Sequence, residues 1–118
     1  MVRFLIAALV AFMVMVPSVA SAAKPGDYNP VMTVAGTGHV VGDTLHVTGS
    51  GFAPSQAVYV ILCDPYSCVS TTTLSDAAGS FPLAWTATSV GLYRFTGGQN
   101  LRGNFQMELQ ASVSVLVE

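Results

Sequence analysis

Alternation of apolar and polar positions recurs along most of this chain. Beyond residue 30, apolar residues alternate with Ser, Thr, His and Gln in short runs that are separated by Gly, Pro, Asn and Asp. This is the pattern of half-buried β-strands. No window there keeps the apolar spacing of an amphipathic helix without an interruption by Gly, Pro or Thr clusters. The pattern predicts seven strands, over residues 31–35, 44–49, 57–63, 68–74, 80–87, 92–96 and 105–117.

Two of these runs carry more information than the others. Residues 57–63 are apolar on both faces, which is typical of a strand in the interior of a sheet. Residues 105–117 alternate throughout, and at about 3.3 Å per residue they would exceed the length of a small sandwich. We therefore expect a bulge, bend or break near Gln110 to Ser112.

Seven short strands with frequent turn signals predict an all-β fold, namely an immunoglobulin-like sandwich of two sheets. Alternation with one apolar face fits two sheets that share a core. A small β-barrel is the structural alternative. The chain length suits one domain.

The first segment has the layout of a secretory signal peptide. Arg3 precedes an apolar run, Phe4 to Val16, and an A-x-A site follows at Ala20-Ser21-Ala22. The alternative is a membrane anchor, but the run is shorter than the roughly 20 residues that a spanning helix needs. We expect a signal-peptide helix over 1–22 that is cleaved after Ala22, a short segment over 23–30 and the sandwich over 31–118. The mature protein would be secreted or extracytoplasmic, without a membrane span.

Charge excludes one class of partner. Only 8% of the residues are charged. Residues 23–118 hold three Lys and Arg against six Asp and Glu, so their net charge is 3 − 6 = −3. No basic patch is available to hold phosphates, and nucleic acid is therefore not an expected partner.

Cys63 and Cys68 are expected to form a disulfide across the end of a hairpin. The loop-entropy relation gives so small a ring about 2 kcal/mol of stabilisation. The alternatives are a redox pair or a metal site, which call for C-x-x-C or for further Cys and His nearby. The two histidines, His39 and His46, are seven residues apart and would not share a strand face. No metal and no cofactor are predicted.

No constellation of catalytic residues is recognisable. Nucleophilic catalysis needs a nucleophile, a base and an orienting group, and no G-x-S-x-G elbow is present. Asp43, Asp64 and Asp76 lie in predicted turns, where Asp bonds local backbone. The sequence therefore predicts a protein that is not an enzyme.

Tyr93 opens the sixth predicted strand in a Gly-x-Tyr-x-Phe run. This is the place of a tyrosine corner, in which the phenol bonds backbone at the end of a sandwich. The alternative is an ordinary core tyrosine.

Two regions are candidates for an interaction surface. Tyr59 and Ile61, together with Tyr66, would form an aromatic patch of low charge; alternatively, a neighbouring segment covers Tyr59 and Ile61. The glycine-rich stretch 97–104 would form a binding loop or a slack hairpin connection. Its candidate residues are Gln99, Asn100 and Arg102.

Several segments resemble known families. Residues 42–54 (GDTLHVTGSGFAP) resemble a segment of secreted bacterial immunoglobulin-like domains, as do 58–63, the DAAGSF hairpin at 76–81 and GLYRF at 91–95. The same layout is similar, more weakly, to the apoproteins of the neocarzinostatin group, which are small secreted sandwiches that hold a reactive chromophore in a cleft. The resemblance covers residues 31–117 and implies a fold rather than an activity.

The sequence therefore predicts an exported, non-catalytic interaction or structural module. Its partner would be another protein, a surface polymer or a second copy of the chain. The alternative function is that of a small-ligand or chromophore carrier of the neocarzinostatin type, and a secreted inhibitor is a third.

Overall fold

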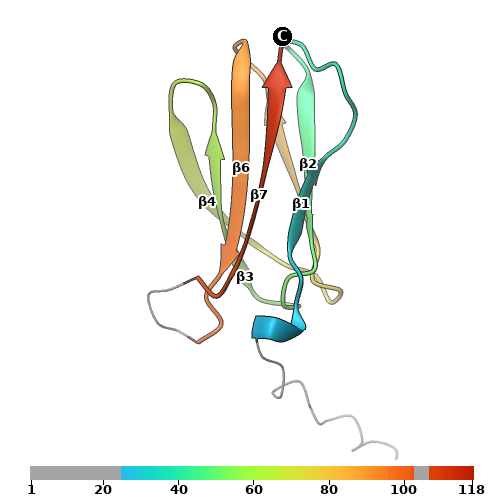
Figure 1. Ribbon diagram of the computed structural model, residues 1–118, viewed down its shortest axis with the longest axis vertical. Helices are drawn as coiled ribbons and strands as arrows, with labels where there is room; N and C mark the ends of the chain where they lie inside the picture. The colour runs from blue at the N-terminus through green and yellow to red at the C-terminus, as the bar shows by residue number, and fades with distance from the viewer. Residues whose placement is uncertain (1–24, 103–106) are drawn as a thin grey trace, which may run out of the picture.

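Two antiparallel sheets pack face to face in this protein. The computed structural model describes residues 25–102 and 107–118. One sheet has three strands in the order β1 (Val31–Val34), β2 (Thr44–Ser50) and β5 (Phe81–Thr86). The other has four, in the order β4 (Cys68–Leu74), β3 (Ala57–Cys63), β6 (Gly91–Gln99) and β7 (Leu109–Val117) (Figure 1). A short 3-10 turn, Pro25–Asp27, precedes β1. The predicted two-sheet, all-β fold with seven strands is confirmed.

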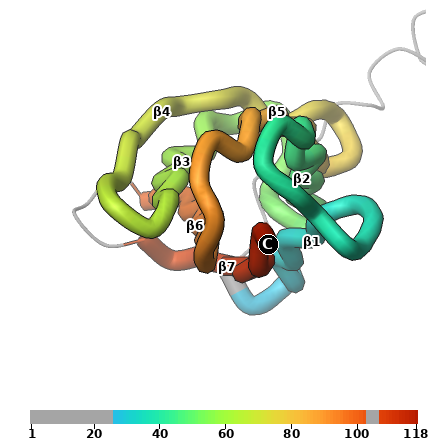
Figure 2. The backbone as a smooth tube through the Cα atoms, turned by 90° about the horizontal axis from the view of Figure 1, so that it is seen from above, coloured from blue at the N-terminus to red at the C-terminus, as the bar shows by residue number. Residues whose placement is uncertain are grey.

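The fourth strand belongs to the sheet of β3. β4 pairs with β3, whereas constant-type immunoglobulin domains place their fourth strand in the opposite sheet. β3 lies between β4 and β6, as its apolar sequence predicts. β1 is an edge strand of the three-stranded sheet and β7 is an edge strand of the four-stranded sheet. These two edges lie side by side, so the first and last strands are neighbours (Figure 2).

The core fills the space between the sheets because alternate side chains of each strand point inward. Val58, Val60 and Leu62 of β3 are buried, as are Leu45 and Val47 of β2. The same core also contains buried side chains from the loops and the remaining strands: Met32, Phe52, Ala53, Phe81, Ala87, Tyr93, Phe95, Leu109 and Val117.

One close contact explains the glycine near the end of β2. The ring of Phe81 occupies the place where a side chain on Gly49 would begin, since a Cβ there would lie 2.3 Å from two ring carbons. Gly49 pairs with Phe81 in the ladder of β2 and β5. The missing side chain therefore leaves room for this ring, whose centroid lies 5.3 Å from that of Phe52.

Strand β6 is longer than predicted. It continues through residues 97–99, which the glycines marked as a loop, and this prediction is wrong. A Cβ on Gly97 would lie 3.3 Å from the sulfur of Met32, and one on Gly98 would lie 3.3 Å from Met107. The two glycines therefore make room for neighbours on opposite faces of the sheet, and they do not end the strand.

Strand β7 is shorter than predicted, and it is not broken. It begins at Leu109 and pairs continuously with β6, from Gln99 opposite Leu109 to Gly91 opposite Val117. The expected bulge or break near Gln110 to Ser112 is therefore wrong, because the strand starts at Leu109 rather than at residue 105 and is short enough without one. Residues 103–106 lie outside the described part of the chain. The remaining strand ends differ from the prediction by at most one residue.

The predicted signal peptide, over 1–22, also lies outside the described residues. In the part that the structure describes, no helix has the length and apolar character to span a membrane.

Candidate functional site

The outer face of the four-stranded sheet presents apolar side chains to solvent. Because Val58, Val60 and Leu62 point into the core, strand alternation turns Tyr59 and Ile61 outward. Their exposed fractions are 47% and 46%. No described segment covers them, so the alternative that a neighbouring segment buries this pair does not hold for the part of the chain that the structure describes.

A groove of about 360 Å³ lies beside these two residues. Its lining comes from β3, from β4 and from the segment before β7: Tyr59, Val60, Ile61, Ser70, Thr71, Thr72 and Met107. Ser70 pairs with Ile61 and Thr72 pairs with Tyr59, so both hydroxyl side chains share the outer face. Met107 lies against Gly98, which pairs with Tyr59 in the sheet. It lines the side of the groove opposite to β4.

The lining defines the chemistry that the groove offers. An aromatic ring, an aliphatic side chain and a thioether supply apolar contact, and the hydroxyls of Ser70 and Thr72, among others, supply hydrogen bonds. The lining contains no Asp, Glu, Lys, Arg or His. Such a site favours an uncharged molecule with an apolar body and a few polar atoms.

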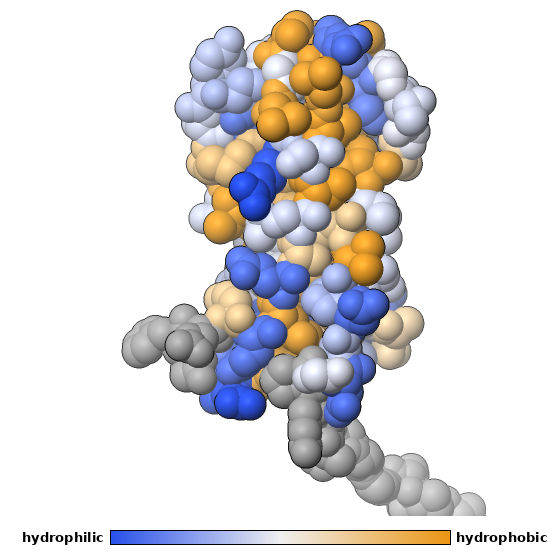
Figure 3. Space-filling view, viewed as in Figure 1, coloured by the Kyte–Doolittle hydropathy of each residue, from blue (hydrophilic) through white to orange (hydrophobic). Residues whose placement is uncertain are grey.

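The same outer face has a second apolar region at the other end of β6. Leu92 and Leu116 form a cross-strand pair there, with exposed fractions of 58% and 53%. Arg94 and Ser114, the next outward pair, separate these leucines from the groove. Val90 is also exposed at this end, where apolar surface is visible (Figure 3).

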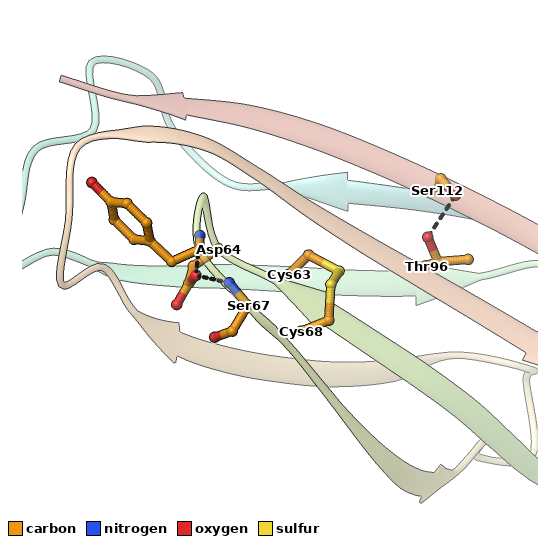
Figure 4. Close-up of a disulfide and its surroundings, with 7 residues drawn as sticks. Cys63, Asp64, Ser67, Cys68, Thr96 and Ser112 are labelled. Carbon is orange, nitrogen blue, oxygen red and sulfur yellow. Dashed lines mark hydrogen bonds between the residues drawn. A yellow bond between two sulfur atoms is a disulfide. The ribbon is translucent and has the colours of Figure 1, made fainter.

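The predicted disulfide is confirmed. Cys63 and Cys68 are direct partners in the ladder of β3 and β4, with their Cα atoms 4.0 Å apart (Figure 4). The turn beyond them has its own hydrogen bonds. Asp64 Oδ1 accepts from the backbone N–H of Tyr66 at 2.7 Å and of Ser67 at 2.8 Å. Asp43 and Asp76 likewise accept backbone hydrogen bonds in their turns.

The three residues predicted from residues 97–104 do not form one surface. Gln99 was expected on an exposed loop, but it lies in β6 with an exposed fraction of 1%, and this prediction is wrong. Its inward orientation follows from strand alternation, which turns Gly98 outward. Asn100 and Arg102 lie after the strand. Glu108 fixes this connection: its Oε1 accepts from the N–H of Leu101 and Arg102, and its Oε2 lies 3.7 Å from Arg102 Nε.

Tyr66 does not join the groove either. It lies in the turn between β3 and β4 with an exposed fraction of 82%, at the end opposite to Tyr59. Of the predicted surface residues, the structure therefore brings only Tyr59 and Ile61 together in the groove.

Met107, Ser70 and Thr72 were missed by the sequence reasoning. Met107 continues the alternation of residues 105–117, which predicted an inward side chain. Its exposed fraction is 40%, because it precedes the first residue of β7 and is not bound by the strand's alternation. The Thr-rich composition of residues 68–74 indicated a strand but no site. Only the expected hairpin pairing of residues 68–74 with 57–63 could have indicated that these side chains lie beside Tyr59 and Ile61.

Tyr93 makes the contacts of a tyrosine corner. Its side chain is fully buried, and its hydroxyl accepts from the N–H of Thr88 at 3.1 Å and of Ser89 at 3.0 Å. The same hydroxyl lies 3.0 Å from the carbonyl oxygen of Ser89, to which it donates. These bonds tie the loop before β6 to the strand itself.

Histidines and acids are dispersed over the described residues. His39 is buried, with Nε2 3.3 Å from the carbonyl oxygen of Gly36, whereas His46 is exposed on β2. No group of three His, Cys, Asp or Glu residues that could hold a metal ion occurs in the part of the chain that the structure describes.

The protein is a two-sheet sandwich with an exposed, largely apolar groove on the outer face of its larger sheet. No protein-family model and no curated protein matches the sequence. Among solved structures, macromomycin has a similar fold: the TM-score is 0.54 at 20% sequence identity, and the similarity covers 76% of this chain and 100% of macromomycin. This likeness concerns the fold alone.

Proposed function

We propose that this protein is a non-catalytic binding protein that holds a small, uncharged, largely apolar molecule on the outer face of its four-stranded sheet. The observation that carries the proposal is the groove at Tyr59, Ile61 and Met107. Its volume of about 360 Å³ lies within the range of small-molecule sites. A similar fold in macromomycin, a protein of the neocarzinostatin group, supports this reading.

The disulfide supports a protein that works outside the reducing cytosol. It lies on the same outer face, next to Ile61 in β3, and joins the two strands that form most of the groove. A rigid pair of strands would limit the entropy lost when a ligand binds.

A titration with a fluorescent probe tests the proposal. The probe is N-phenyl-1-naphthylamine, which is uncharged and aromatic. We expect its emission to rise on binding to the oxidised protein. Tyr59→Ser and Ile61→Ser should each weaken binding at least fivefold, because each removes apolar lining. Tyr66→Ser is the matched control, since the same kind of side chain is lost outside the groove. Equal affinity in all of these proteins would contradict the proposed site.

A second candidate function is an interaction module that binds a protein or a surface polymer. The exposed pair of Leu92 and Leu116 favours it, because this region extends the outer face beyond the size of a small ligand. Mass spectrometry of protein purified from its natural source separates the two functions. A stoichiometric small molecule supports the carrier, whereas a co-purifying macromolecule whose binding is lost in Leu92→Ser supports the module.

A further inference from the structure

β4 has one edge that no described strand covers. β4 pairs with β3 along one side, and no described strand pairs with its other side. Six of its seven residues are exposed. An edge of this kind presents unpaired N–H and C=O groups to solvent and accepts an additional strand.

The structure defines which backbone groups point outward. In an antiparallel ladder, hydrogen-bonded pairs alternate with non-hydrogen-bonded pairs, whose Cα atoms are closer. Asp64 N–H bonds the carbonyl of Ser67, and Ser75 N–H bonds that of Gln56, so these are hydrogen-bonded pairs. The intervening pair of Cys63 and Cys68 is then non-bonded, in agreement with its Cα separation of 4.0 Å. By alternation, the outward-facing groups are those of residues 68, 70, 72 and 74.

The other sheet edges differ from β4. The free edge of β5 contains Pro82, which has no N–H and interrupts any new ladder. β1 and β7 lie side by side, so each limits the access of a further strand to the free edge of the other. β4 has none of the devices that usually protect an edge: Cys68–Leu74 contains no proline and no charged residue.

We propose that two copies of this chain associate through β4, as antiparallel strands related by a two-fold axis. The absence of charge allows identical strands to lie together without like-charge repulsion. In the fully overlapping register Thr71 lies opposite its own copy on the axis, and Ser70 lies opposite Thr72. Such Ser and Thr pairs are favourable across strands.

This register satisfies every outward-facing group of the edge. Residue 70 of each copy pairs with residue 72 of the other, and residue 68 of each copy pairs with residue 74 of the other. The interface therefore has four hydrogen-bonded pairs. Each such pair exchanges two hydrogen bonds, so the interface has about eight. Ser70 and Thr72 line the groove, and the second copy would place the same residues beside it and widen the binding face. The association itself does not rest on the proposed ligand.

Two charged variants that differ at one residue test the pairing. In the proposed register Val69 lies opposite Thr73 of the other copy as a non-hydrogen-bonded pair, in which side chains are close. Val69→Lys with Thr73→Lys sets like charges opposite each other. Val69→Lys with Thr73→Glu sets opposite charges there. Neither residue lies on the outer face, and circular dichroism checks that both variants fold.

The measurement is sedimentation equilibrium of the oxidised protein between about 1 μM and 1 mM, the range of weak association. We expect the wild type to approach twice the monomer mass, the Lys and Lys variant to remain monomeric and the Lys and Glu variant to dimerise. Amide exchange at Ser70 and Thr72 should slow as the wild-type concentration rises. A monomeric wild type over the whole range would overturn the proposal. So would a Lys and Lys variant that dimerises like the wild type, or a Lys and Glu variant that stays monomeric.

Discussion

The side chain of Gln99 forms two hydrogen bonds with the peptide groups of Ala53. Oε1 accepts from the N–H of Ala53 at 2.8 Å, and Nε2 donates to its carbonyl oxygen at 3.0 Å. Ser75 Oγ donates to the same carbonyl at 2.7 Å. The turn after β2 is buried at this point, and its peptide groups bond the side chains of Gln99 in β6 and Ser75 after β4 instead of a neighbouring strand.

Gln99→Leu should lower the free energy of unfolding by about 2 kcal/mol, because the buried N–H of Ala53 loses its acceptor. Chemical denaturation measures the loss. Gln110→Leu is the matched control: Gln110 is exposed on β7, and the same change there should alter stability by less than about 0.5 kcal/mol. Equal stability of the two variants would show that the amide is dispensable.

Tyr93→Phe should destabilise the protein by about 1–3 kcal/mol, since two backbone N–H groups and one carbonyl lose the hydroxyl as their partner. The amides of Thr88 and Ser89 should also exchange faster with solvent. Thermal unfolding and hydrogen exchange measure the two effects. The same substitution at exposed Tyr66 should leave both unchanged. Unaltered exchange at Thr88 and Ser89 in Tyr93→Phe would argue that other groups hold this loop.

Removal of the disulfide should cost about 2 kcal/mol, the entropy that a six-residue ring withholds from the unfolded chain. The double variant Cys63→Ser with Cys68→Ser should keep its β-sheet circular dichroism, because Asp64 maintains the turn without the disulfide. A reductant should bring the wild type to the stability of this variant and leave the variant unchanged. Complete unfolding on reduction would refute this account of the hairpin.

Asp76 should make stability depend on pH. Backbone N–H groups of Ser80 and then Ala78 bond its carboxylate and hold its pKa below the ordinary value, and the N–H of Gly79 acts in the same direction. A carboxyl group with a lowered pKa in the folded state stabilises the fold above its unfolded pKa of about 3.9. This stabilisation is lost as the pH falls through the folded pKa.

Asp76→Asn should therefore be less stable than the wild type at pH 6, and the difference should shrink towards pH 2.5. Urea unfolding at both pH values measures it. Asp43→Asn is the control, because Asp43 accepts from one backbone N–H whereas Asp76 accepts from two. A constant difference between Asp76→Asn and the wild type at both pH values would contradict the linkage.

The strands could be predicted from the sequence because each depends on local alternation. Residues 57–63 and 68–74 were placed without error, since turn signals bound both runs. The extension of β6 could not be predicted, because glycine disfavours a strand locally. Only the packing of Met32 and Met107 against the two faces of residues 97–98 explains their place in the sheet.

The candidate site could be predicted in part. Outward Tyr59 and Ile61 follow from the period of two along β3. The position of Met107 in the groove depends on where β7 begins. The positions of the Ser70 and Thr72 hydroxyls depend on the pairing register of β3 and β4. Both are set by contacts between segments that are distant in sequence. Gln99 was misplaced for the same reason, because its partner Ala53 precedes it by 46 residues.

The placement of β1 beside β7 has a consequence for folding. β1 finds this neighbour only when residues 109–117 have been synthesised, so one side of the core stays open until then. Contacts between such distant segments slow folding and leave apolar surface accessible in the meantime. A chain that stops before Leu109 would therefore lack one neighbour of β1 and would be prone to aggregation.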